Sequence, residues 1–322
     1  MHKLGDLASS EALISELYID LRRRVNGWAD ITKQTAQARM GYIGQHLVSI
    51  ATGFPGGRSG ARGKDLVLPD DQYGEIKTCY RVDQLGACID CQAVVASIEK
   101  RCHSCESENI LRKDDSKWLI GIRTDLEYAQ IIEPKFYYLV LFEFEDLQNP
   151  DVIVASIWRV DPRVPGFAYA MIDYRENIKS KSVSGAPFNL WPHQLKFHLM
   201  RPCLIYRSLI RSDDTIETQI FPGRDEPLPP EMIDLAEFSR SRNLTEEKIE
   251  TAADYLKLGP VEGATKRAKI NWLVEAAKAK GIGPGEFADG LAYGLYRSDI
   301  EEHLSGLPAL LRKHLDEAKL LE

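Results

Sequence analysis

The sequence of 322 residues contains no apolar run of about eighteen residues, the length that a membrane-spanning helix needs. Its first residues, MHKLGDLASSEALISELY, also lack the apolar core of a secretion signal. No internal repeat is visible. These absences argue against a membrane protein, a secreted protein and a repeat array. We therefore expect a cytoplasmic protein which, at this length, forms about two domains.

The chain also lacks an excess of basic charge. There are 41 Lys and Arg against 48 Asp and Glu, which gives a net charge of −7. From residue 213 onward there are 14 basic and 22 acidic residues, which leaves 41 − 14 = 27 basic and 48 − 22 = 26 acidic residues before it. Because the acidity lies in the last third, the first two thirds can still present a basic groove to a nucleic acid.

Cysteine is scarce, with six residues, yet four of them form two matched CxxC pairs ten residues apart. In a chain without a secretion signal this pattern indicates zinc rather than disulfides. Four thiolates leave no coordination position for water, so the predicted Zn²⁺ is structural. The predicted ligands are Cys88, Cys91, Cys102 and Cys105. The other two cysteines, Cys79 and Cys203, are expected to be buried packing residues.

The periodicity of the first 212 residues predicts helices followed by strands. Residues 10–26 read as a helix with a serine cap, and residues 35–50 as a second helix that ends at Thr52–Gly53. Residues 161–184 read as a loop, and residues 188–210 mix strand and helix signals. Further strands are predicted at 117–122, 135–146 and 151–160.

After residue 212 the sequence changes to a proline-rich linker and then to helices. The helix that begins at Ala264 carries a basic first turn and an apolar stripe. It could lie on DNA or pack within its domain, and its acidic surroundings favour packing or dimerisation. The predicted helices span 230–242, 245–257, 262–280, 285–295 and 305–320.

The stretch GKDLVLPDDQYGEIKTC, residues 63–79, places charges where a strand would be buried. Two apolar runs joined by PDDQYG predict a hairpin. Alternate side chains of a strand share a face, so Glu75 and Lys77 lie on one side and Ile76 on the other. Such a pair is either a solvated decoration or part of a metal site.

Hydrolysis of a phosphodiester bond would require carboxylates and a cation of this kind close together. Asp65 at the head of one strand and Glu75 on its neighbour can converge on one Mg²⁺, with the Ile76 carbonyl as a further ligand. Hard oxygen ligands suit Mg²⁺ better than zinc. Lys77 projects from the same face and can orient or deprotonate a water. The alternative is that Asp65 caps a strand and the other two residues are solvated.

The order of a helix, a basic glycine-rich loop and a hairpin carrying D…ExK resembles the PD-(D/E)XK nuclease superfamily. Within it, the chain looks like a type II restriction endonuclease. The combination of GEIKTC with a downstream double CxxC is most similar to the MamI-type family, over about residues 35–212. The resemblance implies catalytic Asp65, Glu75 and Lys77, with Mg²⁺ at the two carboxylates.

The resemblance also implies the fold. We expect an α/β (α+β) protein with a PD-(D/E)XK-like mixed sheet flanked by helices and a zinc-knuckle insert. The nuclease domain would span 1–212 with the insert at about 86–108, and an all-helical domain for dimerisation or DNA contact would span 213–322. Lys64 replaces the proline that usually precedes the first aspartate. Gln45 or His46 stands where many members carry a helix glutamate, so a fourth site residue is left open.

The loop at residues 53–64, GFPGGRSGARGK, offers cations beside the predicted metal site. Glycines allow its backbone to approach a ligand closely. Arg58, Arg62 and Lys64 are therefore candidate contacts to DNA phosphates. The alternative is a solvated loop without a ligand.

The expected function is that of a type II restriction endonuclease, which cuts double-stranded DNA at a specific site with Mg²⁺. Two strands need two active sites, so we expect a homodimer on a symmetric site. A cognate DNA methyltransferase would act on the same site without a stable complex.

Two other functions are compatible with the sequence. A zinc ribbon could bind nucleic acid or a protein without catalysis. A ββα-metal nuclease could use His193, Asn189 and His198, although a histidine in this aromatic stretch is more typical of a core. Whether purified protein cuts plasmid DNA with Mg²⁺ separates catalysis from binding alone.

Overall fold

The computed structural model describes residues 2–32, 41–58, 64–122, 124, 127, 130–175, 187–222, 244–283 and 285–293. The chain forms two compact units that alternate along the sequence. The first comprises 1–118, 137–159 and 204–227, and the second 119–136, 160–203 and 228–322. Within the described ranges, no helix is both long and apolar enough to cross a membrane.

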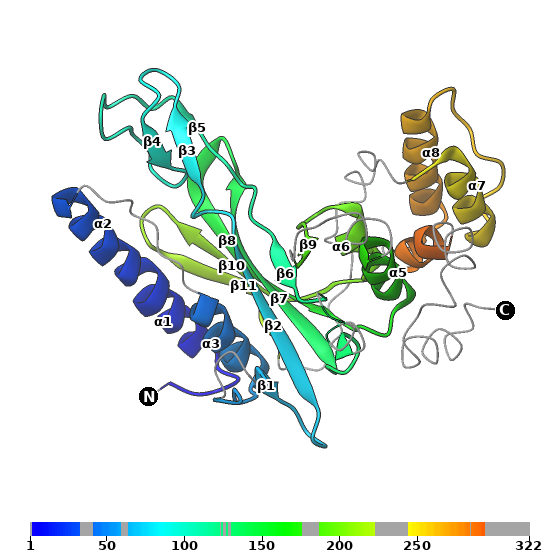
Figure 1. Cartoon of the computed structure of the whole chain (residues 1–322), viewed down its shortest axis with the longest axis horizontal. Coiled ribbons are helices and arrows are strands. Elements are labelled where there is room, and N and C mark those ends of the chain that lie inside the picture. The colour runs from blue at the N-terminus through cyan, green and yellow to red at the C-terminus, as the bar shows by residue number, and fades with distance from the viewer. Residues whose placement is uncertain are drawn as a thin grey trace. The chain divides into compact units, whose positions relative to one another are not determined.

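A six-stranded sheet forms the centre of the first unit, in the order β1-β2-β7-β8-β10-β11 (Figure 1). The two long strands predicted from aromatic and branched residues are β7 and β8, which are buried over most of their length. The strands are β1 (Leu66–Val67), β2 (Tyr73–Tyr80), β7 (Phe136–Asp146), β8 (Asn149–Val160), β10 (Cys203–Arg211) and β11 (Ile216–Ile220).

Three helical segments follow one another at the start of the chain. They are α1 (Leu7–Leu13), the π-helix η1 (Ile14–Asp20) and α2 (Leu21–Thr32). The predicted serine cap is wrong, because the helix begins about one turn earlier. Asp6 is the N-cap, and its Oδ2 accepts a hydrogen bond of 2.9 Å from the Ser9 N–H. A carboxylate satisfies the unpaired N–H groups of a first turn and complements the helix dipole.

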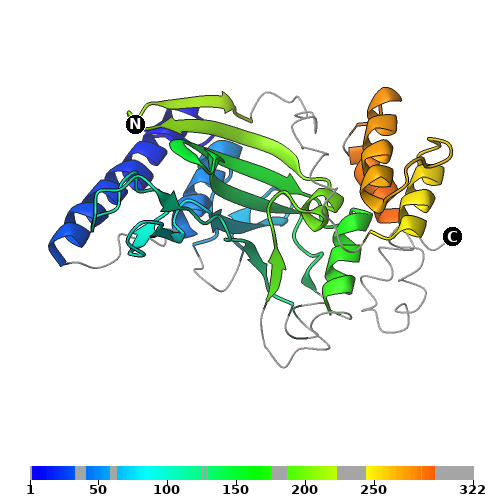
Figure 2. The same ribbon diagram turned by 90° about the horizontal axis from the view of Figure 1, so that it is seen from above.

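Aromatic rings pack the first helices against the sheet. Tyr18 of η1 and Tyr80 of β2 both lie on Phe142 of β7, with ring centroids 4.9 and 4.8 Å apart. Such ring pairs add about 0.5–1.5 kcal/mol to the free energy gained from burying their area. The helices α1, α2 and α3 lie along one face of the sheet (Figure 2).

The helix α3 (Gly41–Thr52) packs directly on β2. A Cβ atom at Gly44 would lie 2.0 Å from the Thr78 Oγ1, so only glycine allows this approach. Thr78 therefore faces the helices, and strand alternation turns Glu75 and Lys77 to the other face. The described part of α3 ends at Thr52 as predicted, and Gly53 follows with φ of 78°.

A small antiparallel sheet follows β2 and carries the CxxC pairs. Its order is β4-β3-β5, from β3 (Leu85–Cys88), β4 (Val94–Ala96) and β5 (Ile110–Leu111). Two cysteines and two branched side chains form its own buried cluster: Cys88, Val95, Cys102 and Ile110. We call residues 85–111 the zinc module.

The second unit is mostly helical in its described part. Its elements are the paired strands β6 (Trp118–Ile120) and β9 (Phe188–Leu190) and the helices α5 (Pro165–Asp173), α6 (Leu195–Leu199), α7 (Glu246–Tyr255) and α8 (Lys266–Ala279). Residues 285–293 are also helical. The helix α5 corrects the prediction of a loop over 161–184. The stretch of mixed signals resolves into β9, α6 and β10.

Parts of the predicted architecture remain predictions. The predicted helices 230–242 and 305–320 lie outside the described residues. The strand β11 lies beyond residue 212 and pairs with β10 in antiparallel register. The division into domains 1–212 and 213–322 stays a prediction.

Candidate active site and zinc site

The β1–β2 hairpin places Asp65 opposite Glu75. Leu66 pairs with Gly74 in antiparallel register, so the residue before Leu66 faces the residue after Gly74. Leu66 is fully buried. Its neighbour Asp65 immediately precedes β1. The hairpin therefore brings the two predicted carboxylates close enough for Glu75 to raise the pKa of Asp65.

The turn of the hairpin fixes this register. Asp70 and Asp71 both have positive φ, 56° and 57°, and the Gln72 N–H donates to the Pro69 carbonyl at 3.2 Å. The Leu68 N–H donates to the Gln72 carbonyl at 3.0 Å, so the register of the strands leaves three residues, 69–71, in the loop. Aspartate tolerates positive φ better than most residues. The PDDQ stretch thus decides which side chain faces Asp65.

Two hydrogen bonds orient the Asp65 carboxylate. Its Oδ2 accepts from the Ile76 N–H at 2.9 Å, and its Oδ1 accepts from the Gln45 Nε2 at 3.2 Å. Burial is the largest effect and raises the pKa of Asp65, whereas the hydrogen bond from the Ile76 N–H lowers it. The Glu75 carboxylate raises this pKa as well, and the Lys77 ammonium lowers it. Asp65 therefore sits in a partly desolvated place that already contains a second negative charge.

Glu75 and Lys77 form an ion pair on the same face. The Lys77 Nζ lies 2.5 Å from the Glu75 Oε1, and the Lys77 and Glu75 side chains are about one quarter exposed, at 27% and 24%. Ile76 between them is 5% exposed and points to the helix side. The structure thus brings together all three residues singled out from the hairpin, with Gln45 as a fourth.

Of the two neighbours that the sequence left open as a fourth site residue, Gln45 is the one that contacts Asp65. Its amide reaches Asp65 because α3 lies close to β2 at Gly44. His46, the next residue, is exposed to solvent. The choice depends on the rotation of α3 against the hairpin, which the sequence alone does not give.

The residues at this site fit a divalent cation with hard oxygen ligands. Asp65 accepts two hydrogen bonds, whereas a carboxylate offers about four acceptor positions. The facing carboxylate of Glu75 raises the pKa of Asp65, and a bound cation would relieve this repulsion. Asp65 and Glu75 are therefore suitable ligands for Mg²⁺.

The glycine-rich loop runs along the outer side of β1. The Gly57 N–H donates to the Asp65 carbonyl at 3.3 Å, and the Val67 N–H donates to the Pro55 carbonyl at 2.9 Å. Arg58, which follows with φ of 54°, is exposed. This pairing brings the start of the loop next to Asp65.

The other two cations of the loop differ in position. The Lys64 Nζ donates to the Asp71 carbonyl at 2.9 Å and lies 5.7 Å from the centre of the Tyr73 ring. Lys64 therefore lies along the hairpin. Arg62 lies outside the described residues.

The four cysteine sulfurs of the zinc module converge on one point. All four Sγ atoms lie within 4.8 Å of one another, and two pairs are 3.6 and 3.5 Å apart. A tetrahedron with Zn–S bonds of about 2.3 Å has edges of about 3.8 Å, so the arrangement fits Zn²⁺. The residues are Cys88, Cys91, Cys102 and Cys105. The Ser104 N–H donates to the Cys102 Sγ at 3.4 Å and lowers the pKa of this thiol.

The two CxxC turns share one backbone geometry. In the first, the Gln92 N–H donates to the Cys88 carbonyl at 3.0 Å, and in the second the Glu106 N–H donates to the Cys102 carbonyl at 2.9 Å. Gln92 and Glu106 both have positive φ, 62° and 58°. Two turns of the same construction that face each other are what a four-thiolate site requires.

The remaining cysteines and histidines have other surroundings. Cys79 is 1% exposed, and burial raises its pKa to about 12, whereas Cys203 is only half-buried. His198 is 2% exposed, and its Nε2 lies 3.1 Å from the His193 carbonyl. Asn189 lies in the short strand β9. A buried histidine engaged with backbone does not suit a ββα-metal site.

Comparison with known proteins identifies the family. The sequence model described as the MamI restriction endonuclease matches residues 27–234, well over half of the chain. No protein of curated function and no solved structure matches. The matched region contains the D…ExK hairpin and the four-cysteine cluster, and the match confirms the resemblance to the MamI-type family. The chain belongs to the MamI restriction endonuclease family, so its substrate is DNA and its reaction is hydrolysis.

Proposed function

We propose that this member of the MamI restriction endonuclease family is a type II enzyme, which cuts both strands of DNA at a specific site with Mg²⁺. The observation that carries the proposal is the proximity of Asp65, Glu75 and Lys77 at the β1–β2 hairpin. The family gives the substrate, and these three residues give a place for the chemistry.

Each residue has a role in this proposal. Asp65 and Glu75 hold Mg²⁺, which when bound stabilises charge on the phosphate and lowers the pKa of water. Lys77, held at 2.5 Å from Glu75, orients the attacking water and stabilises the developing negative charge. Gln45 holds the Asp65 carboxylate in position through its hydrogen bond to Oδ1. Gln45 is thus a positioning residue.

The order of elements supports assignment to the PD-(D/E)XK superfamily. A helix, α3, is followed by a hairpin whose first strand begins after the aspartate and whose second strand carries ExK. The second strand then lies beside β7 in a larger sheet. This is the order that the superfamily core requires.

The contacts to DNA are proposed from the loop beside the site. Arg58, Arg62 and Lys64 contact phosphates next to the scissile bond, because the loop backbone pairs with the segment that contains Asp65. The Zn²⁺ held by the four cysteines is structural. The region 213–322 would serve dimerisation or DNA contact.

We also propose a homodimer that acts in the cytoplasm. Two active sites related by a two-fold axis match the two strands of a symmetric site. A DNA methyltransferase of the same specificity would protect the host DNA without a stable complex.

Incubation of purified protein with phage DNA and Mg²⁺ tests the proposal. Discrete fragments whose ends share one sequence are expected, and a chelator should abolish them. Binding of DNA without cleavage under any divalent ion would instead favour the second candidate, a non-catalytic zinc module, which the converging cysteines make credible. A smear of fragments would contradict site specificity.

A further inference from the structure

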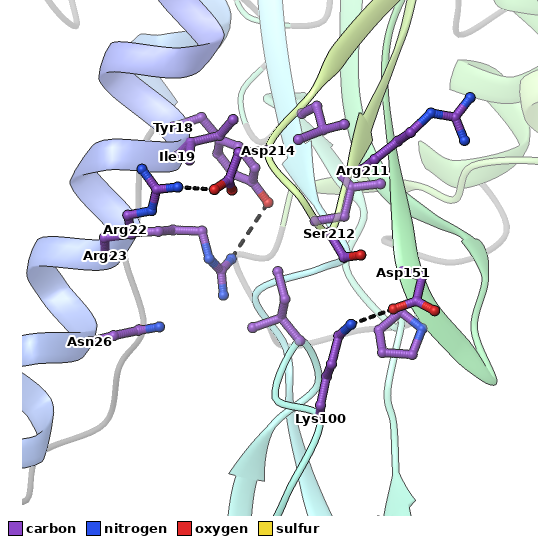
Figure 3. A pocket seen from close by; sticks show the side chains of 14 residues that line it. Tyr18, Ile19, Arg22, Arg23, Asn26, Lys100, Asp151, Arg211, Ser212 and Asp214 are labelled. Atoms are coloured by element: carbon purple, nitrogen blue, oxygen red, sulfur yellow. Dashed lines mark hydrogen bonds and ion pairs between the residues drawn. The ribbon is translucent and has the colours of Figure 1, made fainter.

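A pocket of about 200 Å³ lies in the first unit, among η1, α2, the zinc module and the β10–β11 turn. Its volume is below the usual range of about 300–1,000 Å³ for drug-sized ligands. Lining residues come from both sides of the opening, with Arg22 and Arg23 on the helix and Lys100 across from them, whereas the Arg211 guanidinium points away (Figure 3). The hairpin with Asp65 and Glu75 contributes no lining residue.

The buried end of the pocket carries a fixed guanidinium. Arg22 is 9% exposed, and its Nη1 donates to the Asp83 Oδ1 at 2.5 Å and to the Tyr18 hydroxyl at 3.5 Å. Its Nε and Nη2 donate to no other described residue. Because Arg22 lines the pocket, these two N–H groups are available to a ligand there. A guanidinium held from behind is suited to bidentate binding of a phosphate.

Three more cations stand at the rim with partners that can be exchanged. They are Arg23, Lys100 and Arg211, paired with Asp214, Asp151 and Glu217. The cationic side chains are 57%, 58% and 45% exposed. Exposed ion pairs of this kind contribute little to stability, so a doubly charged ligand can draw these cations inward at small cost.

Among the described residues, one polar atom in the wall lacks a partner. The Asn26 Oδ1 is buried and accepts no hydrogen bond from them, and Asn26 lines the pocket. A buried acceptor without a donor is unfavourable, because it has lost its water and gained nothing in return. A turn of the Asn26 amide would bring this oxygen to a ligand hydroxyl in the pocket. The isoleucines at 19, 98 and 153 provide an apolar wall for a short carbon chain.

We propose that this pocket binds a small phosphate monoester with a hydroxyl group, held at its phosphate by Arg22. Arg23 and Lys100 contact the remaining phosphate oxygens, and Asn26 accepts from the hydroxyl. The site is separate from the proposed cleavage site, since the two share no residue. It would give the enzyme a small-molecule ligand besides DNA.

Titration calorimetry with inorganic phosphate and with glycerol 3-phosphate tests this inference. Saturable binding with one site per chain is expected, tighter for the ester because it also reaches Asn26. The change of Arg22→Gln should weaken binding at least about 100-fold, and Lys100→Gln about three- to tenfold, in line with lost charge-assisted hydrogen bonds. Arg22→Gln also removes the ion pair of the buried Asp83, so if this variant fails to fold, Lys100→Gln decides the test.

The control is Arg101→Gln. Arg101 is the neighbour of Lys100, is paired with Glu108 and is 63% exposed, but does not line the pocket. Binding should be unchanged in this variant, and cleavage of DNA should be unchanged in Lys100→Gln. Absence of saturable binding to the wild type would overturn the proposal. So would equal weakening by Arg101→Gln, or competition by a DNA duplex for the phosphate site, which would assign these cations to DNA.

Discussion

At the scale of single residues, the site combines groups whose charges oppose one another. Burial and the Glu75 carboxylate both raise the pKa of Asp65, so both disfavour its ionised form. Sequence spacing identified the three residues of the hairpin, because alternation in a strand depends only on local geometry. It did not identify the partner of Asp65, because the bond to Gln45 depends on how α3 packs.

The raised pKa of Asp65 predicts that this carboxylate lowers the stability of the fold while it is needed for cleavage. A carboxyl group whose pKa is higher in the folded than in the unfolded protein binds a proton more readily in the folded state. The free energy of unfolding therefore falls as the pH rises from the unfolded pKa to the folded pKa, and it stays at the lower value at higher pH. We expect Asp65→Asn to raise the melting temperature at neutral pH without Mg²⁺ and to abolish cleavage. Thermal melts with and without Mg²⁺ measure this. A lower melting temperature for the variant would contradict the electrostatic account.

Gln45 should act through Asp65. The change Gln45→Ala removes the hydrogen bond to Oδ1, so we expect about a tenfold loss of cleavage rate and a higher Mg²⁺ requirement. Cleavage measured over a range of Mg²⁺ concentrations tests this, with His46→Ala as the matched control because His46 is adjacent and exposed. Equal effects of the two changes would remove Gln45 from the site.

At the scale of elements, the contact between α3 and β2 positions the site. A methyl group at Gly44 would meet Thr78 at 2.0 Å, so Gly44→Ala must push α3 away from the strand. We expect a loss of about 1–3 kcal/mol in the free energy of unfolding, together with reduced cleavage. Gly41→Ala in the same helix, with nothing within 4 Å, should change neither. Denaturant unfolding of both variants measures the difference, and a neutral Gly44→Ala would contradict the packing.

The zinc module is the element whose formation depends on a ligand. We expect one Zn²⁺ per chain in the wild type and none in Cys88→Ser. In this variant residues 85–111 should unfold before the cleavage chemistry at the β1–β2 hairpin changes. Elemental analysis and thermal melts test this. Cys203→Ser is the control, since Cys203 lies outside the sulfur cluster and should retain the metal. Far less than one zinc per wild-type chain would exclude the site.

Elements were predictable where one local signal dominates. The strands β7 and β8 follow from runs of aromatic and branched residues, and the zinc module follows from the cysteine spacing. The helix α5 was missed because proline and glycine at its start suggest a turn, whereas in the structure Pro165 occupies the first helical turn, where its missing N–H costs nothing. The first cap was missed because serines and an aspartate compete for one position.

At the scale of the whole molecule, the interleaved units could not be read from the sequence. Each unit is built from three separated segments, and such long-range pairing leaves no local signal. The two-fold assembly rests on the need to cut two strands. We expect sedimentation of the purified protein to show twice the mass of one chain, and a strictly monomeric protein that still cuts both strands together would contradict the homodimer.

The most direct test of the central claim compares cleavage and DNA binding in Glu75→Ala and Lys77→Ala. Each change should slow cleavage by about 10²–10⁴-fold, the usual cost of losing an electrostatic or acid–base participant. Binding in gel shifts should persist in both variants, and Glu108→Ala, on the exposed surface of the zinc module, should cut at the wild-type rate. Full cleavage activity in either hairpin variant would show that the Glu75–Lys77 face is solvated decoration rather than the active site.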